Sequence, residues 1–384
     1  MNTSDKEAQQ SEQACLISLH HSKFRVNFGF ENINTMKTEN KNRIEQIKDF
    51  LGDRYPAFTL NQISNAIYKQ GAKSYEDIST LKKDLRTDLK NKFGDVLSLK
   101  ALTKSEEKQA TKVLFETKDG QRIESVRMSY LPNEERKVGH SALCVSTQSG
   151  CAMGCRFCAT GATGFRRNLT ADEIADQLLY FIQNKIDIDT VFFSGMGEPF
   201  ANPNFFRAVE IFTNYMGLSD RKLSVSTCGI IEGIKTLSEK YPQINLALSL
   251  HSPFQKQREE LMPATKSNPL PEVLGAIKEH IYKNNKKVFF AYVMLKDVND
   301  SDEHAKDLVK LVRKFGKKSY LCHVNLIKFH EGPTMIRFQP STPERLDQFC
   351  KIFDTRHISY TIRQNFGSDI EAACGQLYAK YVLK

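Results

Sequence analysis

The stretch that decides the fold is residues 143–199, LCVSTQSGCAMGCRFCATGATGFRRNLTADEIADQLLYFIQNKIDIDTVFFSGMGEP. It opens with a short β-rich apolar run, LCVST, and closes with a second run, TVFFSGMGEP, from residue 190. Between them, TADEIADQLLYFIQN has the apolar spacing of a helix, and Thr170 with Glu173 forms a capping-box pattern at its start. A strand, a helix and a second strand form a βαβ unit, which predicts parallel pairing of the two strands.

The same alternation continues toward the C-terminus. Four more strand candidates follow, KLSVSTCG at 222, INLALSLHS at 244, KVFFAYVML at 287 and LCHVNLI at 321, with helices such as SDEHAKDLVKLVRKF between them. The pattern predicts an α/β fold whose parallel sheet is open or curled into a partial (β/α)6 TIM-like barrel. The segments GMGEP, STCG, SLHS and VNLI end these strands, so we expect them to meet at one rim.

The chain before this core divides into three regions. Residues 1–35 are expected to be a poorly ordered extension. Residues 36–100 show helical spacing and many lysines, which predicts a small helical accessory domain whose basic face either contacts RNA phosphates or is only solvated. Residues 101–140 form a linker region with a β-hairpin, because KVLFETKDGQRIESVRM alternates around Asp119 and Gly120. The catalytic core then covers residues 141–384.

Composition narrows the class of protein. The chain has 384 residues, nine cysteines and a formal net charge of +10. An odd number of cysteines without a spaced framework is typical of a reducing compartment, so cytoplasm is the expected location. No run approaches the roughly 18 apolar residues of a membrane span, and we expect no membrane partner. The positive charge favours an anionic partner such as nucleic acid.

Three cysteines form a C-x3-C-x2-C triplet in the loop after the first core strand, Cys151, Cys155 and Cys158. A structural zinc site is the alternative interpretation, but such a site takes four ligands, and no matching Cys or His pair stands elsewhere in the chain. Three thiolates suit three irons of a [4Fe-4S] cluster, which leaves the fourth iron open to a substrate. Nearby, the glycines of GMGEP let the backbone approach a ligand, and Glu198 is placed to bind an ammonium group.

Taken together, these motifs resemble a known family. The triplet, GMGEP, STCG, SLHSP, HVNLI and AACGQLY are similar to the radical S-adenosylmethionine (SAM) RNA methyltransferases of the RlmN and Cfr type. The resemblance runs from about residue 40 to the end of the chain. It implies a [4Fe-4S] cluster and SAM as cofactors, and an electron donor such as flavodoxin or ferredoxin. It also implies a monomer that acts on 23S ribosomal RNA.

The resemblance assigns roles to residues that spacing alone does not. Cys374 matches the cysteine that is methylated and carries the methyl group, and Cys144 matches the partner that resolves the covalent intermediate through a transient disulfide. Glu124 matches the proton acceptor, although its position on a hairpin by itself favours a solvent-facing glutamate. The residues implied to bind SAM are Gly197, Glu198, Ser226, Ser249, Leu250, His251 and Asn325.

The implied chemistry uses two SAM molecules. The first methylates the Cys374 thiolate by displacement, and the second is cleaved at the cluster to give a 5′-deoxyadenosyl radical that takes hydrogen from the S-methyl group. The methylene radical adds to an adenine carbon, a base removes a proton, and attack by Cys144 on Cys374 releases the methylated base. The adenine must leave its stack to reach Cys374.

Two branches of the family differ in the carbon they methylate. Cfr enzymes modify C8 of an adenosine at the peptidyl transferase centre and cause resistance to phenicols, lincosamides, oxazolidinones, pleuromutilins and streptogramin A. RlmN enzymes modify C2 of the same adenosine and of transfer RNA. Phe366 and Tyr378 favour Cfr, whereas Pro199 departs from it. Two other classes stay open, a radical SAM enzyme for a peptide or small molecule and a zinc-stabilised RNA-binding protein.

Overall fold

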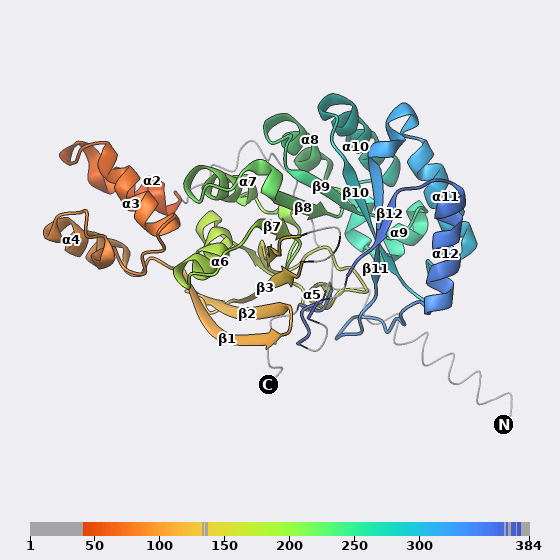
Figure 1. The fold of residues 1–384 in the computed structure, drawn as a ribbon, viewed down its shortest axis with the longest axis horizontal. Helices are drawn as coiled ribbons and strands as arrows, with labels where there is room; N and C mark the ends of the chain where they lie inside the picture. The colour runs from red at the N-terminus through yellow and green to blue at the C-terminus, as the bar shows by residue number, and fades with distance from the viewer. Residues whose placement is uncertain are drawn as a thin grey trace, which may run out of the picture. The chain divides into compact units, whose positions relative to one another are not determined.

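The computed structural model describes residues 41–132, 134, 137–364, 366–367, 370–373 and 375–377 (Figure 1). The predicted extension at 1–35 and Cys374 lie outside the described residues, as does Tyr378. Within the described part of the chain, none of the helices combines the length and the apolar character needed to cross a bilayer. The predicted boundaries at 35, 100 and 140 remain predictions.

A single mixed sheet of ten strands organises the core, in the order β1-β2-β3-β4-β7-β8-β9-β10-β11-β12. The first three pairings are antiparallel and the six from β4 to β12 are parallel. Its strands are β1 Leu99–Glu107, β2 Ala110–Thr117, β3 Arg122–Tyr130, β4 His140–Val145, β7 Thr190–Phe193, β8 Leu223–Thr227, β9 Asn245–Ser249, β10 Val288–Met294, β11 Cys322–Lys328 and β12 Tyr360–Ile362. Among the described residues β1 and β12 do not pair, so the sheet is not closed, as the prediction of an open sheet or a partial barrel requires.

Helices connect the parallel strands, and Figure 1 shows α7, α8 and α10 following one another along one side of the sheet. The predicted capping box is confirmed at α6, where Thr170 accepts from the Glu173 backbone N–H and Glu173 accepts from the Thr170 N–H. The helices of this region are α5 Ala159–Ala162, α6 Ala171–Gln183, α7 Phe205–Glu210, α8 Ile231–Lys240, α9 Gln255–Leu261, α10 Leu270–Asn284, α11 Asp302–Arg313 and α12 Pro343–Thr355. A small separate ribbon pairs β5 Gln148–Gly150 with β6 Phe165–Asn168.

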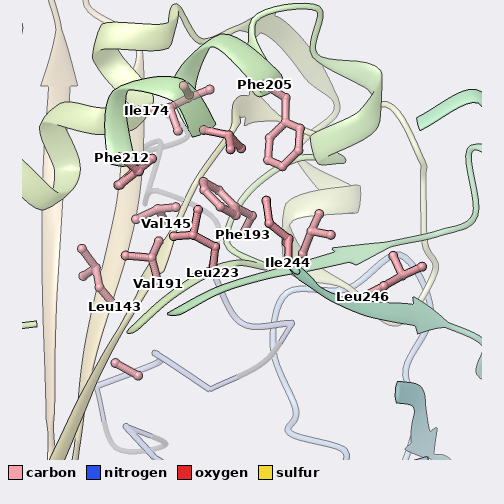
Figure 2. Packing of buried hydrophobic residues seen from close by; sticks show 14 of the residues in the cluster. Leu143, Val145, Ile174, Val191, Phe193, Phe205, Phe212, Leu223, Ile244 and Leu246 are labelled. Carbon is pink, nitrogen blue, oxygen red and sulfur yellow. The ribbon is translucent and has the colours of Figure 1, made fainter. Parts of the chain in front are cut away.

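The two faces of the parallel strands have different surroundings. One face packs on the helices, and Figure 2 shows Phe193 of β7 meeting Phe205 and Phe212 from the segment around α7. Its ring centroid lies 4.9 Å from that of Phe205 and 5.4 Å from that of Phe212, both edge-on. On β9, buried Leu246 and Leu248 alternate with half-buried residues. This alternation leaves the opposite face of the sheet for polar side chains.

All six predicted core strands are present, but two further strands of the ten-stranded sheet were missed, as were the two short strands of the separate ribbon. The strand β1 adds a third member to the predicted hairpin, and β12 adds a seventh parallel strand. Most β1 side chains are exposed and many are charged, as is common at a sheet edge, so the segment lacks the apolar alternation that marks a strand. The strand β12 has only three residues, too few to show a period.

Residues 43–93 form helices, as the spacing predicts: α2 Arg43–Leu51, α3 Phe58–Tyr68 and α4 Lys83–Phe93. A buried ion pair joins them to the core. The Arg43 guanidinium donates to both carboxylate oxygens of Asp176 on α6, at 2.9 and 2.6 Å, and to the Tyr68 hydroxyl at 3.2 Å. The backbone N–H and hydroxyl of Ser98 also donate to Asp176, which is fully buried. The carboxylate therefore has a donor for each oxygen.

Replacing Asp176 with alanine is expected to lower the free energy of unfolding by about 3–5 kcal/mol, because it leaves a buried guanidinium without its counter-charge. Urea unfolding followed by circular dichroism measures the change. Asp49→Ala is the matched control, since the Lys41–Asp49 pair is exposed and such pairs contribute about 1 kcal/mol or less. Equal losses of unfolding free energy in Asp176→Ala and Asp49→Ala would contradict the conclusion that Asp176 compensates a buried charge on Arg43.

Candidate active site

The three cysteines of the triplet occupy one short loop between β5 and α5. All three side chains are half-buried, and Gly154 inside the loop has a φ of +61°, which a residue with a side chain rarely adopts. Burial raises the pKa of Cys151 to about 12. The pKa of Cys155 is also raised, first by burial and then by the charges of Cys151 and Cys158. The three sulfur atoms are therefore close enough to affect one another.

The donor set fits a [4Fe-4S] cluster. Without a metal, Cys151 and Cys155 hold their protons at neutral pH, and binding a metal would displace these protons, because the ligand is the thiolate. Among the described residues no three His, Cys, Asp or Glu side chains are placed to hold one metal ion. A [4Fe-4S] cluster requires a different arrangement of its ligands, since each thiolate binds its own iron atom.

The GMGEP segment is fixed against the chain that leads into the cysteine loop. Gly195 donates its N–H to Val145 O at 3.0 Å, and the Glu198 N–H donates to the side chain of Gln148 at 2.9 Å. A Cβ on Gly195 would lie 2.7 Å from Val145 O, and one on Gly197 would lie 2.6 Å from Gln148 Cβ. A backbone hydrogen bond from Gly197 acts against the rise in the Cys151 pKa. The glycines therefore permit the close approach that brings this segment to the first cysteine.

Glu198 connects the ends of two neighbouring strands. Its buried carboxylate accepts from the Thr227 hydroxyl at 2.7 Å and the Cys228 N–H at 2.7 Å. The Phe200 N–H donates to it as well, at 3.2 Å. Burial raises the pKa of Glu198, and these hydrogen bonds oppose the rise. A carboxylate has about four acceptor sites, so an ammonium group would find about one left beside these three donors.

Five of the predicted residues lie on the sheet face opposite the helices. Side chains that pair across neighbouring strands share a face, as do residues two apart along a strand. Cys144 pairs with Val126, two residues after Glu124, and on its other side with Phe192. The residue pairings from Phe192 across β8, β9, β10 and β11 place three more of the predicted residues on the same face, Ser226, Ser249 and Asn325.

The polar groups on this face contact one another locally. The hydroxyl oxygens of Ser226 and Ser249 are 3.4 Å apart. Asn325 accepts from the hydroxyl of Thr361 at 2.8 Å, so the strand missed by sequence, β12, orients a predicted ligand-binding amide. Leu250 differs, because its side chain is fully buried and its N–H already donates to Ala291 O at 3.0 Å. Any contact of Leu250 with a ligand on this face would have to come from its backbone.

His251 is a buried, neutral imidazole. Its Nδ1 accepts from the Val293 N–H at 3.0 Å, which leaves Nε2 to carry the proton. Its ring meets Phe157 of the cysteine loop edge-on, with centroids 4.8 Å apart. Burial, and after it the charge of Arg258, lowers the pKa of His251 to about 3. The side chain therefore offers one fixed N–H donor near the cysteine loop.

His251 is expected to make the protein less stable in acid. Its folded pKa of about 3 lies below the usual 6.5, so between these values the unfolded chain binds the proton more readily. Its contribution to stability is complete above about pH 6.5 and is lost as the pH falls toward 3. Urea unfolding measures this change. Between pH 7.5 and pH 5.0, the free energy of unfolding should fall less in His251→Gln than in the wild type. His357→Gln, at an exposed position, should keep the wild-type pH dependence.

Glu124 is buried, so the interpretation as a solvent-facing glutamate is wrong; only 2% of the residue is exposed. Its carboxylate lies 3.4 Å from Lys112 Nζ, and that ammonium also donates to the backbone oxygen of Glu371 at 3.2 Å. Lys112 therefore links the predicted proton acceptor to the segment that precedes Cys374. The sulfur of Cys144 lies 3.4 Å from the hydroxyl oxygen of Ser194.

The described residues after Cys374 contact the start of α5, which directly follows Cys158. The Ala159 N–H donates to Gly375 O at 2.7 Å, and the hydroxyl of Thr160 donates to Leu377 O. Farther from the loop, Gln376 donates to Glu331 O at 2.9 Å. A cavity of about 30 Å³ adjoins this segment, with Phe366, Ala372 and Ala373 in its wall. The chain that follows Cys374 is thus held near the proposed cluster ligands.

Comparison with known proteins agrees with these motifs. Residues 145–309 match the radical SAM superfamily. The chain is 46% identical over 344 residues to a ribosomal RNA large subunit methyltransferase Cfr of Clostridium botulinum strain Loch Maree, covering 88% of this chain and 98% of that protein. The Cfr methyltransferase of Staphylococcus aureus is 44% identical over 353 residues, which cover 90% and 99% of the two chains.

A solved structure is also similar. The radical SAM methyltransferase of Sphaerobacter thermophilus superposes with a TM-score of 0.80 at 35% identity, covering 88% of this chain and 98% of that one. The curated relatives therefore agree with the resemblance to Cfr over nearly their whole length. This chain belongs to the radical SAM ribosomal RNA large subunit methyltransferases of the Cfr type.

Proposed function

We propose that this protein methylates C8 of a specific adenosine of 23S ribosomal RNA at the peptidyl transferase centre. The modification would confer resistance to phenicols, lincosamides, oxazolidinones, pleuromutilins and streptogramin A. The observation that carries the proposal is the contact between the chain after Cys374 and the start of α5, directly after the cysteine loop, through Gly375 O and the Ala159 N–H at 2.7 Å. A methyl group carried at residue 374 would be close to a radical formed in that loop.

Three residues carry the polar steps of the proposed reaction. The Cys374 thiolate attacks the methyl carbon of SAM, and S-adenosylhomocysteine leaves. After the S-methylene carbon has joined the adenine, the radical adduct must lose one electron, for which the oxidised cluster would be the acceptor, and Glu124 accepts the proton from the substituted ring carbon. Cys144 then attacks the Cys374 sulfur and a disulfide forms. The bond from that sulfur to carbon breaks, its electron pair stays on the methylene carbon, and this carbon takes up a proton to become the methyl group. Glu124 and Cys144 suit these roles because they share one face of adjacent strands.

The cofactor sites follow from the same geometry. Cys151, Cys155 and Cys158 would hold the [4Fe-4S] cluster, which supplies the electron that cleaves SAM into a 5′-deoxyadenosyl radical. The neutral His251 would donate its remaining N–H to SAM, and the Glu198 carboxylate would accept from the methionine ammonium. The full set proposed for SAM is Gly197, Glu198, Ser226, Ser249, Leu250, His251 and Asn325.

Several partners belong to the same proposal. An electron donor such as flavodoxin or ferredoxin would reduce the cluster, and the protein would act as a cytoplasmic monomer. The net charge of +10 supports binding to RNA phosphates. Arg167 is a poor candidate for a phosphate contact, because its guanidinium already donates to both Asp119 and Glu173 at 2.7–2.8 Å.

Mass mapping of ribosomal RNA tests the regiochemistry. Cells that lack their own adenosine methyltransferase for this site would express the protein, and we expect 8-methyladenosine in the 23S fragment of the peptidyl transferase centre. Detection of 2-methyladenosine alone would replace the C8 proposal with the RlmN reaction, and transfer RNA from the same cells would then be mapped. An unmodified adenosine in cells that contain iron-loaded protein would reject both reactions.

A further inference from the structure

A buried arginine stands beside the cysteine loop without a full set of partners. Arg258 lies on α9 and none of its surface is exposed. One of its nitrogens, Nη2, donates to two backbone oxygens at the ends of neighbouring strands, Cys228 O and Ser249 O, the latter at 3.3 Å. Its Nε and Nη1 have no hydrogen-bond partner among the described residues.

Such an arrangement is costly unless an anion completes it. Removing a guanidinium from water costs several kcal/mol, and buried charges in native proteins are normally paired and hydrogen-bonded. Arg43 illustrates the ordinary case, because Asp176 receives both ends of its guanidinium. Among the residues that the structure describes, no carboxylate forms a hydrogen bond or ion pair with Arg258. Its two unpaired N–H-bearing nitrogens therefore point to a negatively charged group that the chain acquires from outside.

The surroundings identify where that anion would be. The end of α9 packs on the cysteine loop, since Leu261 O accepts the Arg156 N–H at 2.9 Å. The side chains of Leu261 and Met262 belong to an apolar cluster against which Cys155 packs. Burial lowers the pKa of Arg258, while charges on Cys228, Cys155 and Glu198 act in the opposite direction. The guanidinium is thus close to the middle thiol of the proposed cluster site.

We propose that Arg258 is a positioning residue that compensates the negative charge of the [4Fe-4S] cluster and its thiolates and so favours cluster reduction. Reduction adds an electron to an assembly that is already anionic, and a fixed cation in a site of low dielectric stabilises the reduced form more than the oxidised form. The inference rests on the proposed cofactor, but it does not depend on which RNA carbon is methylated.

A redox titration of the anaerobically reconstituted protein, without RNA, tests the inference. Electron paramagnetic resonance would report the ratio of reduced to oxidised cluster at fixed potential. We expect this ratio to fall at least about tenfold in Arg258→Met, equivalent to about 59 mV for one electron. Arg258→Lys keeps the charge and should stay within about threefold of wild type. Lys256→Met removes an exposed charge from the same helix and should leave the ratio unchanged.

Two results would overturn the proposal. One is an Arg258→Met protein that carries a full cluster and has the same ratio of reduced to oxidised cluster as the wild type. The other is a fall of this ratio in Arg258→Lys as large as that in Arg258→Met. If Arg258→Met alone fails to load a cluster that Arg258→Lys accepts, the need for a cation is supported. Wild-type protein that binds no iron or sulfide would instead reject the proposed cofactor, which separates the two failures.

The metal-free protein gives a second measurement. Without the cluster, no carboxylate in the described part of the chain bonds directly to the Arg258 guanidinium, so metal-free Arg258→Met should unfold at a temperature no lower than metal-free wild type. A purely structural role, in which Arg258 serves only to hold Cys228 O and Ser249 O, predicts a lower unfolding temperature. A lower midpoint, or failure of the metal-free variant to fold, would therefore overturn the proposal.

Discussion

Replacing Cys374 with serine is expected to abolish methylation of ribosomal RNA while leaving the cluster in place. A serine hydroxyl is almost entirely protonated at neutral pH, so it cannot take the methyl group from SAM as a thiolate does. The fall should be roughly 10⁴-fold or more, the scale found when a catalytic nucleophile is removed. Transfer of labelled methyl groups from SAM to a 23S transcript measures it, and peptide mass analysis should find S-methylcysteine only in the wild-type protein.

Cys350→Ala is the matched control for this loss. Cys350 is a buried free thiol on α12, away from the sheet face that carries Glu124 and Cys144. Its replacement removes one core sulfur, so we expect about 1 kcal/mol of lost stability and activity within a few-fold of wild type. Methylation of the 23S transcript by Cys374→Ser would show that Cys374 does not carry the methyl group. Iron content equal to wild type excludes misfolding as the cause of inactivity.

The strands that carry the site could be predicted because each is a buried apolar run. Residues 190–193 and 244–249 show this, since alternate side chains pack on helices and the rest face the site. The parallel centre of the sheet could be predicted, but its two edges could not. The edges that decide where it stops, β1 and β12, are charged or very short, so neither has a sequence pattern of its own.

The cysteine triplet could be predicted because its three ligands lie within eight residues of sequence. Lys112 and Arg258 could not, since each acts through contacts with residues distant in the chain. Lys112 reaches Glu371 O, 259 residues away, and a lysine within an alternating strand gives no sign of burial. Arg258 lies in the polar helix QKQREEL, where an arginine is expected on the surface. Only the folded arrangement shows that both side chains are buried at the site.

Replacing Cys144 with alanine is expected to trap the enzyme on its RNA. The proposed final step breaks the bond between the Cys374 sulfur and the new carbon, and it requires a second thiol to attack that sulfur. Alanine supplies no thiol, so the reaction should stop after carbon–carbon bond formation with the RNA still attached. We expect free methylated product to fall by about 10²-fold or more, with at most one RNA bound per protein. A denaturing gel should show a protein–RNA band that survives boiling.

Two variants distinguish this covalent trap from ordinary damage. The double variant Cys144→Ala, Cys374→Ser should form no band, because the attachment requires the sulfur of Cys374. Cys322→Ala removes a buried thiol from the amino end of β11 and should turn over without accumulating the band. A normal yield of free product from Cys144→Ala would show that another group resolves the intermediate. In that case the position of Cys144 beside Val126, on the face shared with Glu124, would have no role in product release.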